Sequence, residues 1–198
     1  MKITRRMIRS FALMLVICGS AGAADLSYTY VDLNLVKDNA SPAFDGFGLA
    51  GSYAFSDSLF LSARYQSVTS DEIDVGFGSG TIDVRGYLIG AGWHAAVSDG
   101  SDFVAQLAYL HGDADSHVPG AAFSLSDSGY DAGIGIRSLV TPALELNVGW
   151  DYSHSDSGGS STLSSVGGIY SFDAFGVRIA FLSDSEDTTT ELGIRIPF

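Results

Sequence analysis

Two clusters of histidine and aspartate are the strongest candidates for catalytic chemistry in this sequence. His111 precedes Asp113 and Asp115, and His154 lies between Asp151 and Asp156. An Asp–His pair or paired carboxylates could activate water as a general base, provided that the partners come within hydrogen-bonding reach. The spacing alone does not establish that reach. Solvated loop side chains are the alternative that the sequence favours.

Other kinds of site find less support in the sequence. Serine is abundant, but no Ser–His–Asp constellation can be identified from spacing. Acidic runs at 71–74 and 184–187 could attract divalent cations, yet they lack the regular ligand spacing of a calcium loop, and the alternative is a solvated, self-repelling loop. We therefore expect no catalytic residue, no cofactor, no metal site and no enzymatic activity.

The first 23 residues have the organisation of an export signal. A cationic segment with Lys2 and three arginines precedes an apolar run at 11–18, and Ala21 and Ala23 form a small-x-small cleavage pattern. This pattern predicts a cleaved signal peptide over 1–23 and a mature domain over 24–198. The only cysteine, Cys18, lies in the segment to be removed, so we expect the mature chain to lack disulfides and thiolate metal ligands.

The composition of the predicted mature chain excludes several classes of protein. It keeps six Lys and Arg against 23 Asp and Glu, a formal charge of −17. Such acidity disfavours nucleic acid as a partner, because phosphate binding needs clustered cations. The hydrophobic content of the full sequence, 46%, argues against a disordered chain. No apolar run is long enough to cross a membrane as a helix.

The elements that must position any site are strands, because the hydrophobic period from residue 24 onward is two almost everywhere. In the segment 45–55, Phe47, Leu49 and Tyr53 fall on one face, whereas Gly46 and Gly48 fall on the other. A solvated sheet face would usually carry long polar side chains instead of glycine. Glycine weakens a strand unless space is tight, as it is inside a narrow barrel.

Aromatic residues on the apolar faces gather at the two ends of the strands, as membrane barrels arrange them at their two interfaces. One predicted band comprises Tyr53, Phe55, Trp93, Phe103 and Phe198, and the other comprises Tyr65, Tyr109, Tyr130, Trp150 and Tyr152. Connections at the first end are short. At the second end we expect long polar loops at 69–80 and 112–124, and the tract 153–165 is typical of a flexible exposed linker.

Nine strands are clear from the pattern, at 26–37, 44–55, 59–68, 81–95, 102–111, 127–139, 143–153, 174–182 and 188–198. An up-and-down barrel with both termini on one side needs an even number of strands. A weak strand within 160–172 would supply the tenth. We therefore predict an all-β, transmembrane, antiparallel up-and-down barrel of ten strands, with eight strands as the alternative.

Opposite charges on neighbouring predicted strands suggest how these strands pair. Folding the chain around Thr141 puts Arg137 directly opposite Glu145, and folding it through 183–187 puts Arg178 directly opposite Glu191. Such pairs stabilise a sheet modestly and neutralise charge in a narrow lumen. The predicted lumen is lined by Arg64, Gln66, Gln106, Arg137, Glu145, Asn147, Arg178, Glu191 and Arg195.

The signal peptide, the glycine-interleaved strands ("GFGLAGSYAF", "GYLIGAGWH", "YDAGIGIR") and the terminal "ELGIRIPF" resemble small outer-membrane β-barrel proteins. That group includes the OmpX and Ail adhesin-like barrels and the transmembrane part of OmpA. The layout is similar to a porin-like, diffusible-signal-factor-regulated family. In such proteins the last strand is the signal that the barrel-assembly machinery recognises. The residues that match it here are Leu192, Ile194, Ile196 and Phe198.

The resemblance implies a monomer in the outer membrane of a Gram-negative cell. Its expected partners are outer-membrane lipid and lipopolysaccharide, with periplasmic chaperones and the barrel-assembly machinery during biogenesis. The expected role is porin-like or envelope-structural, with a narrow polar lumen. The alternative is an adhesin that binds host surfaces through its extracellular loops, and an outer-membrane enzyme is a third possibility.

Overall fold

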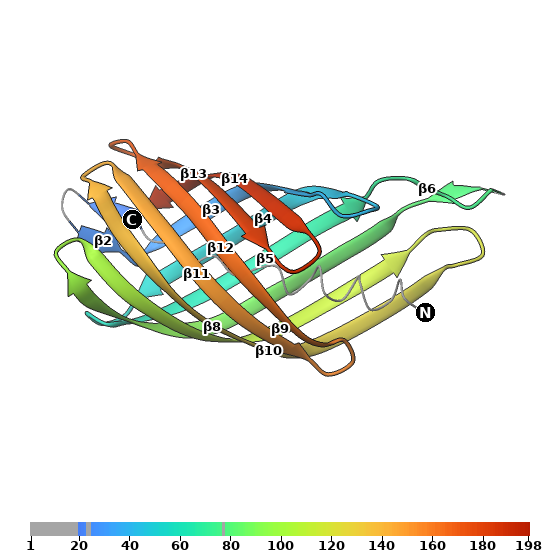
Figure 1. The fold of residues 1–198 in the computed structure, drawn as a ribbon, viewed down its shortest axis with the longest axis horizontal. Helices are drawn as coiled ribbons and strands as arrows, with labels where there is room; N and C mark the ends of the chain where they lie inside the picture. Colours follow the sequence, from blue (N-terminus) through green and yellow to red (C-terminus); the bar gives the residue numbers. More distant parts are fainter. Residues whose placement is uncertain (1–19, 23–24, 77) are drawn as a thin grey trace.

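The computed structural model describes residues 20–22, 25–76 and 78–198, so the predicted signal peptide lies almost entirely outside the described residues. The strands form one closed barrel and two small two-stranded sheets (Figure 1). The barrel strands are β3 (Tyr30–Asp38), β4 (Phe44–Ala54), β5 (Leu59–Ser70), β8 (Ile82–Ser98), β9 (Ser101–Ser116), β10 (Phe123–Thr141), β11 (Leu144–Ser155), β12 (Gly159–Ser171), β13 (Gly176–Ser183) and β14 (Thr188–Pro197). The small sheets pair β1 (Ser20–Gly22) with β2 (Asp25–Ser27), and β6 (Ile73–Asp74) with β7 (Ser79–Gly80).

Every barrel strand is antiparallel to its neighbours, and the barrel closes where β14 pairs with β3. Ile194 lies opposite Leu33 at this seam. The prediction of ten strands is confirmed, and the weak tenth strand is β12, which pairs with β11 along its whole length. Because the sheet has no free edge at the seam, its backbone hydrogen bonds are satisfied within the barrel wall.

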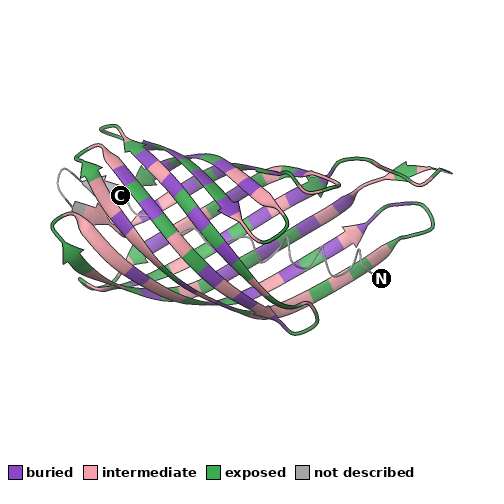
Figure 2. Cartoon of the chain, in the orientation of Figure 1, coloured by how far each residue is buried: buried purple, intermediate pink, exposed green. Residues whose placement is uncertain are grey.

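Burial alternates residue by residue along the strands (Figure 2). Large apolar side chains are exposed all around the barrel wall, for example Ile89 at 59% and Leu107 at 61%. A continuous apolar surface of this kind is unfavourable in water and favourable in a bilayer. The outer wall therefore faces lipid, as expected from the sequence.

Aromatic side chains meet across neighbouring strands at both ends of the wall. Trp93 packs against Phe103 at 6.2 Å between ring centroids, near the short turns. At the other end, the rings of Tyr87 and Tyr109 lie 6.3 Å apart. These pairs mark the two interfaces of the predicted membrane span.

The loops differ from the sequence-based prediction. Residues 112–124 are mostly strand, because β9 and β10 remain paired out to Ser116 and Phe123. The tract 153–165 is not a flexible linker but the ends of β11 and β12 around a turn of three residues. Alternating polar and small residues can pair as well as apolar ones where the strands stand in water, so low hydrophobicity alone did not identify a loop.

Strands β8, β9 and β10 extend beyond the barrel rim as an overhang (Figure 1). An apolar cluster lies between its inner side and the outer ends of β3, β4 and β5, whereas the sequence pattern predicted small or polar residues on that face. The buried members are Val36, Phe44, Val68, Ile82, Val84, Leu88, Ala108, Leu110, Ala114 and Val118. Ile73, Val75 and Phe123 pack against it, so the segment after β5 is folded onto the overhang.

The outer side of the overhang is charged. Arg85 on β8 donates a hydrogen bond to Asp115 on β9 at 2.6 Å. Hydrogen bonds from Ser124 and Arg85 lower the pKa of the Asp115 carboxyl below its usual range. Charged side chains facing outward place this part of the sheet in water, beyond the lipid-facing wall.

Two arginine substitutions on β8 test which part of the wall faces lipid. Ile89 and Val97 are almost equally exposed, at 59% and 58%, but Ile89 lies between the two aromatic bands and Val97 lies beside the short turn. We expect Ile89→Arg to lower the free energy of unfolding by about 2–4 kcal/mol, against about 0–1 kcal/mol for Val97→Arg. Urea unfolding in liposomes measures both values. Equal and small effects would contradict a lipid-facing wall.

Candidate functional site

The lumen holds the charged residues that the alternating pattern assigned to the inner face. Four of its arginines are Arg64, Arg137, Arg178 and Arg195, and all are buried. Eight of the nine predicted lumen residues are buried, and the ninth, Gln106, donates a hydrogen bond from its side chain to Ser62 at 2.5 Å. Charged groups in such a position must be paired, because an isolated buried ion is strongly unfavourable.

An ion-pair network crosses the middle of the lumen. Glu191 on β14 accepts hydrogen bonds from Arg178 on the neighbouring β13, at 2.8 Å, and from Arg64 on β5. Two further strands, β3 and β4, separate β5 from β14 in the barrel order, so the Arg64 contact spans the interior. Arg178 also donates to Asn34 on β3 at 2.9 Å. One carboxylate therefore links β13, β14 and β5 through the interior of the barrel.

Two more ion pairs lie nearer the short-turn end. The Arg137 Nε and Nη2 atoms lie 2.9 and 3.1 Å from the two carboxylate oxygens of Glu145, which is a bidentate contact. Arg195 donates from Nε to Asp32 at 2.7 Å, across the seam between β14 and β3. Bidentate arginine–carboxylate contacts hold both side chains in one geometry.

The register of both predicted pairs was wrong by two residues. Arg137 lies directly opposite Asn147 rather than Glu145, and Arg178 lies opposite Gly193 rather than Glu191. The side chains meet diagonally instead, which is within the reach of a long arginine. In the first hairpin, an irregularity between 139 and 141 shifts the register.

The segment that leads into β3 packs against the inner side of the barrel at its short-turn end. The alternating pattern predicted that residues 26–29 belong to the first barrel strand, but β3 begins at Tyr30, and residues 26 and 27 pair with β1 instead. The ring of Tyr28 stacks on His94 at 3.7 Å and packs against Phe60 at 5.1 Å. Segment 26–29 is referred to below as the mouth segment.

Tyr28 is held on every side. The guanidinium of Arg137 lies 4.2 Å above its ring, and its hydroxyl donates to Asp102 at 2.9 Å. Its carbonyl accepts a hydrogen bond from Ser52 at 2.8 Å. The side chain therefore contacts β5, β8, β9 and β10, and the backbone carbonyl contacts β4, so one residue connects half of the barrel strands at this mouth.

The candidate catalytic residues do not assemble into one site. Asp151 faces the lumen and is buried, whereas His154 faces outward and contacts Ser160 at 3.0 Å. His111 contacts Ser128 through Nδ1 at 2.9 Å, and its Nε2 lies 3.8 Å from Asp113, which is beyond hydrogen-bonding distance. Asp151 and His154 thus lie on opposite faces of the wall, whereas His111 and Asp113 share a face but lie too far apart for a hydrogen bond.

The side chains of the acidic runs accept hydrogen bonds from the backbone of their own turns. Asp184 accepts backbone hydrogen bonds from residues 186 and 187, and Asp74 accepts one from Gly76. Within the described part of the chain, no group of three or more His, Cys, Asp or Glu is placed to hold a metal ion. No helix among residues 20–22, 25–76 and 78–198 is long and apolar enough to cross a membrane.

Comparison with known proteins identifies the family. The family model for the outer membrane protein beta-barrel domain matches residues 10–181, so the chain belongs to this family and to the outer membrane. The predicted resemblance to small outer-membrane barrels is thus confirmed. A search of curated proteins found no match.

Solved structures with the same fold include the transport unit of the autotransporter AIDA-I from Escherichia coli, with a TM-score of 0.58 and 11% identity, covering 99% of this chain and 97% of that one. The NanC porin has a TM-score of 0.52 and 8% identity, covering 85% of this chain and 100% of that one. Ail, the attachment invasion locus protein of Yersinia pestis, in complex with the heparin analogue sucrose octasulfate, has a TM-score of 0.48 and 15% identity, with coverages of 86% and 97%. At these identities the similarity concerns the fold.

Removing one acid tests the lumen network. Glu191→Gln leaves Arg64 and Arg178 beside a neutral amide, and we expect it to lower the free energy of unfolding by about 3–5 kcal/mol. The matched control is Asp45→Asn, which removes an acid from the exposed Lys37–Asp45 pair and should cost about 1 kcal/mol or less. Urea unfolding in micelles compares the two variants. Equal losses would contradict a structural role for the network.

Proposed function

We propose that this outer-membrane barrel is closed and that its role is envelope-structural, without a steady open channel. The observation that carries the proposal is the contact between Arg64 and Glu191 across the lumen, which lies above a second obstruction at Tyr28. A general pore needs a continuous water-filled path with low barriers. Two successive obstructions, each held by several strands, oppose such a path.

The ion pairs also suit a structural role. Three of them join neighbouring strands, and the Arg64–Glu191 pair joins β5 to β14, which are three places apart in the barrel order, so the wall resists flattening. A porin-like role remains the competing proposal, and the shared fold with the NanC porin is compatible with it. The two proposals differ in one measurable property, the unit conductance.

Conductance across a planar bilayer tests the closed barrel. We expect the purified wild-type protein to show no steady channel. The double variant Tyr28→Ala/Arg64→Ala removes both obstructions and should conduct steadily, at least several-fold above wild type. Tyr53→Ala is the control, because it removes a tyrosine of the same size that faces outward at the same end of the barrel. A change in electrophoretic mobility after heating shows whether each variant was folded.

A steady wild-type conductance equal to that of the double variant would contradict the closed barrel and favour the porin-like proposal. A silent wild type with a conducting double variant would support closure by these two side chains.

The overhang favours a second candidate function, the binding of a surface partner. It carries β8–β10 beyond the membrane wall, and the buried apolar cluster packs it against the ends of β3, β4 and β5. A rigid sheet held away from the membrane is suited to display binding residues. This supports the adhesin alternative, in which the segment after β5 contacts the partner.

Neutralising the acids of that segment tests the adhesin proposal while keeping its packing. The variant Asp71→Asn/Glu72→Gln leaves Ile73 and Val75 on the apolar cluster. We expect it to change the adhesion of expressing cells to host cells at least two-fold, with Asp45→Asn as the control. If cells that express the wild-type protein adhere no better than cells without it, this candidate function is removed.

A further inference from the structure

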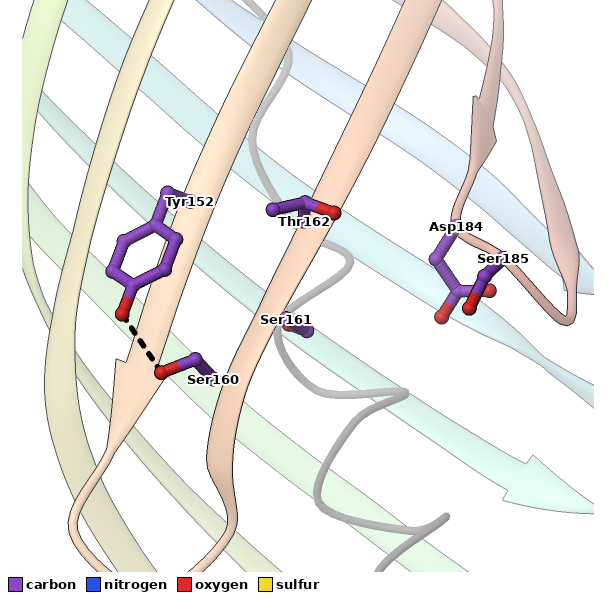
Figure 3. Close-up of a pocket in the computed structure, with 6 residues that line it drawn as sticks. All are labelled: Tyr152, Ser160, Ser161, Thr162, Asp184 and Ser185. Atoms are coloured by element: carbon purple, nitrogen blue, oxygen red, sulfur yellow. Dashed lines mark hydrogen bonds between the residues drawn. The ribbon is translucent and has the colours of Figure 1, made fainter.

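A notch in the barrel rim lies between β12 and the turn that joins β13 to β14 (Figure 3). The notch arises because β13 is shorter than β12. The pairing of β12 with β13 begins at Ser164 and Ser183, so residues 159–163 of β12 are paired only on the side of β11. The edge of β12 that faces the notch therefore offers free backbone donors and acceptors.

The lining of the notch consists almost entirely of hydroxyl groups and one carboxylate. Its cavity has a volume of about 210 Å³ and is lined by Tyr152, Ser160, Ser161, Thr162, Asp184 and Ser185. Such a lining offers many groups that both donate and accept hydrogen bonds. It offers no apolar pocket for an acyl chain.

Two of the lining groups are held in place by their neighbours. The Tyr152 hydroxyl lies 2.8 Å from Ser160 Oγ, and Ser160 Oγ also lies 3.0 Å from Nδ1 of His154 (Figure 3 shows the first contact). Asp184 uses Oδ1 for the backbone of its own turn. Among the described residues no hydrogen-bond donor reaches its Oδ2, which is left for a ligand.

We propose that this notch binds a single pyranose ring, neutral or bearing an amine. A sugar ring offers several hydroxyls that match the hydroxyls, the carboxylate and the open strand edge. The volume is below the ~300 Å³ at which pockets for drug-sized ligands begin, so the notch fits one ring rather than an oligosaccharide. The carboxylate of Asp184 and the acidity of the chain disfavour phosphorylated or sulfated sugars.

The position of the notch fits this ligand. Tyr152 belongs to the aromatic band at the outer interface and packs near Tyr130 at 6.3 Å. The notch therefore opens just above the lipid-facing wall, where the sugars of outer-leaflet glycolipids lie and where free saccharides arrive from outside. The proposal is independent of whether the lumen conducts.

A related cluster on the neighbouring hairpin provides a matched control. Tyr109 and His111 share Ser128 as Tyr152 and His154 share Ser160, with contacts of 3.0 and 2.9 Å. There too, residues 123–128 of β10 are paired only with β9, because the pairing of β10 with β11 begins at Gly129 and Ser155. The turn after β11 covers this edge, since the Asp156 amide donates to the Ser128 carbonyl at 2.9 Å and the Ser157 amide donates to Asp127 at 3.2 Å. The cluster is repeated there, but its strand edge is occupied.

Binding is measured by amide chemical shifts of the isotope-labelled protein in lipopolysaccharide-free micelles, titrated with glucose and with glucosamine. We expect saturable shifts at residues 159–163 and 184–185. Tyr152→Phe and Asp184→Asn should each weaken binding at least five-fold, whereas Tyr109→Phe should leave it unchanged. Absence of saturable shifts, or equal weakening by Tyr109→Phe, would overturn the proposal.

The source of the sugar is distinguished by reconstitution. Nanodiscs that contain lipopolysaccharide should shift the same amides, relative to phospholipid nanodiscs, if the ring belongs to a glycolipid of the membrane. Shifts with free sugars alone would assign the notch to soluble saccharides. Either result supports a pyranose site.

Discussion

The structure depends on one constraint: within hydrocarbon, every backbone N–H and C=O group needs a partner from the protein itself. A chain without apolar helices meets this constraint only by closing a sheet. The seam between β14 and β3 completes the closure, and it brings the last strand of the chain against the first of the barrel. Both the apolar outer wall and the enclosed lumen follow from that closure.

Closure also determines where the charges lie. The predicted mature chain has only six basic residues, and four of them, the lumen arginines, face the interior. The other two, Lys37 and Arg85, pair with acids at the outer end of the barrel. Because lipid excludes charge from the outer wall, the ion pairs concentrate inside, where they join neighbouring strands and, through Arg64 and Glu191, strands three places apart.

The sequence predicted the barrel, its ten strands and the faces of most residues, because a period of two determines which side each residue takes. It did not predict the register. A local irregularity near Thr141 moved Arg137 by two positions, and periodicity cannot detect such a shift, because moving by two residues leaves every side chain on the same face. Charge pairing alone was compatible with both registers.

Two parts of the interior were missed for different reasons. The mouth segment continues the alternating pattern of β3, so nothing local distinguishes Tyr28 from a strand residue, and its contacts with β5, β8, β9 and β10 are all distant in sequence. The overhang was missed because its inner face is apolar. The signal was present in Ile82, Val84 and Leu88, which alternate with charged or aromatic residues.

The central claim is that lipid contacts the outer wall while the arginines line the interior of the barrel. Tryptophan fluorescence in vesicles of brominated phospholipid tests this claim. The variant Trp150→Phe leaves Trp93 as the fluorophore, and the variant Trp93→Phe leaves Trp150. Both side chains face outward at opposite ends of the wall, so bromines placed near the lipid carbonyls should quench both strongly, and aqueous acrylamide should quench them weakly. Strong quenching by acrylamide with no effect of brominated lipid would contradict the account.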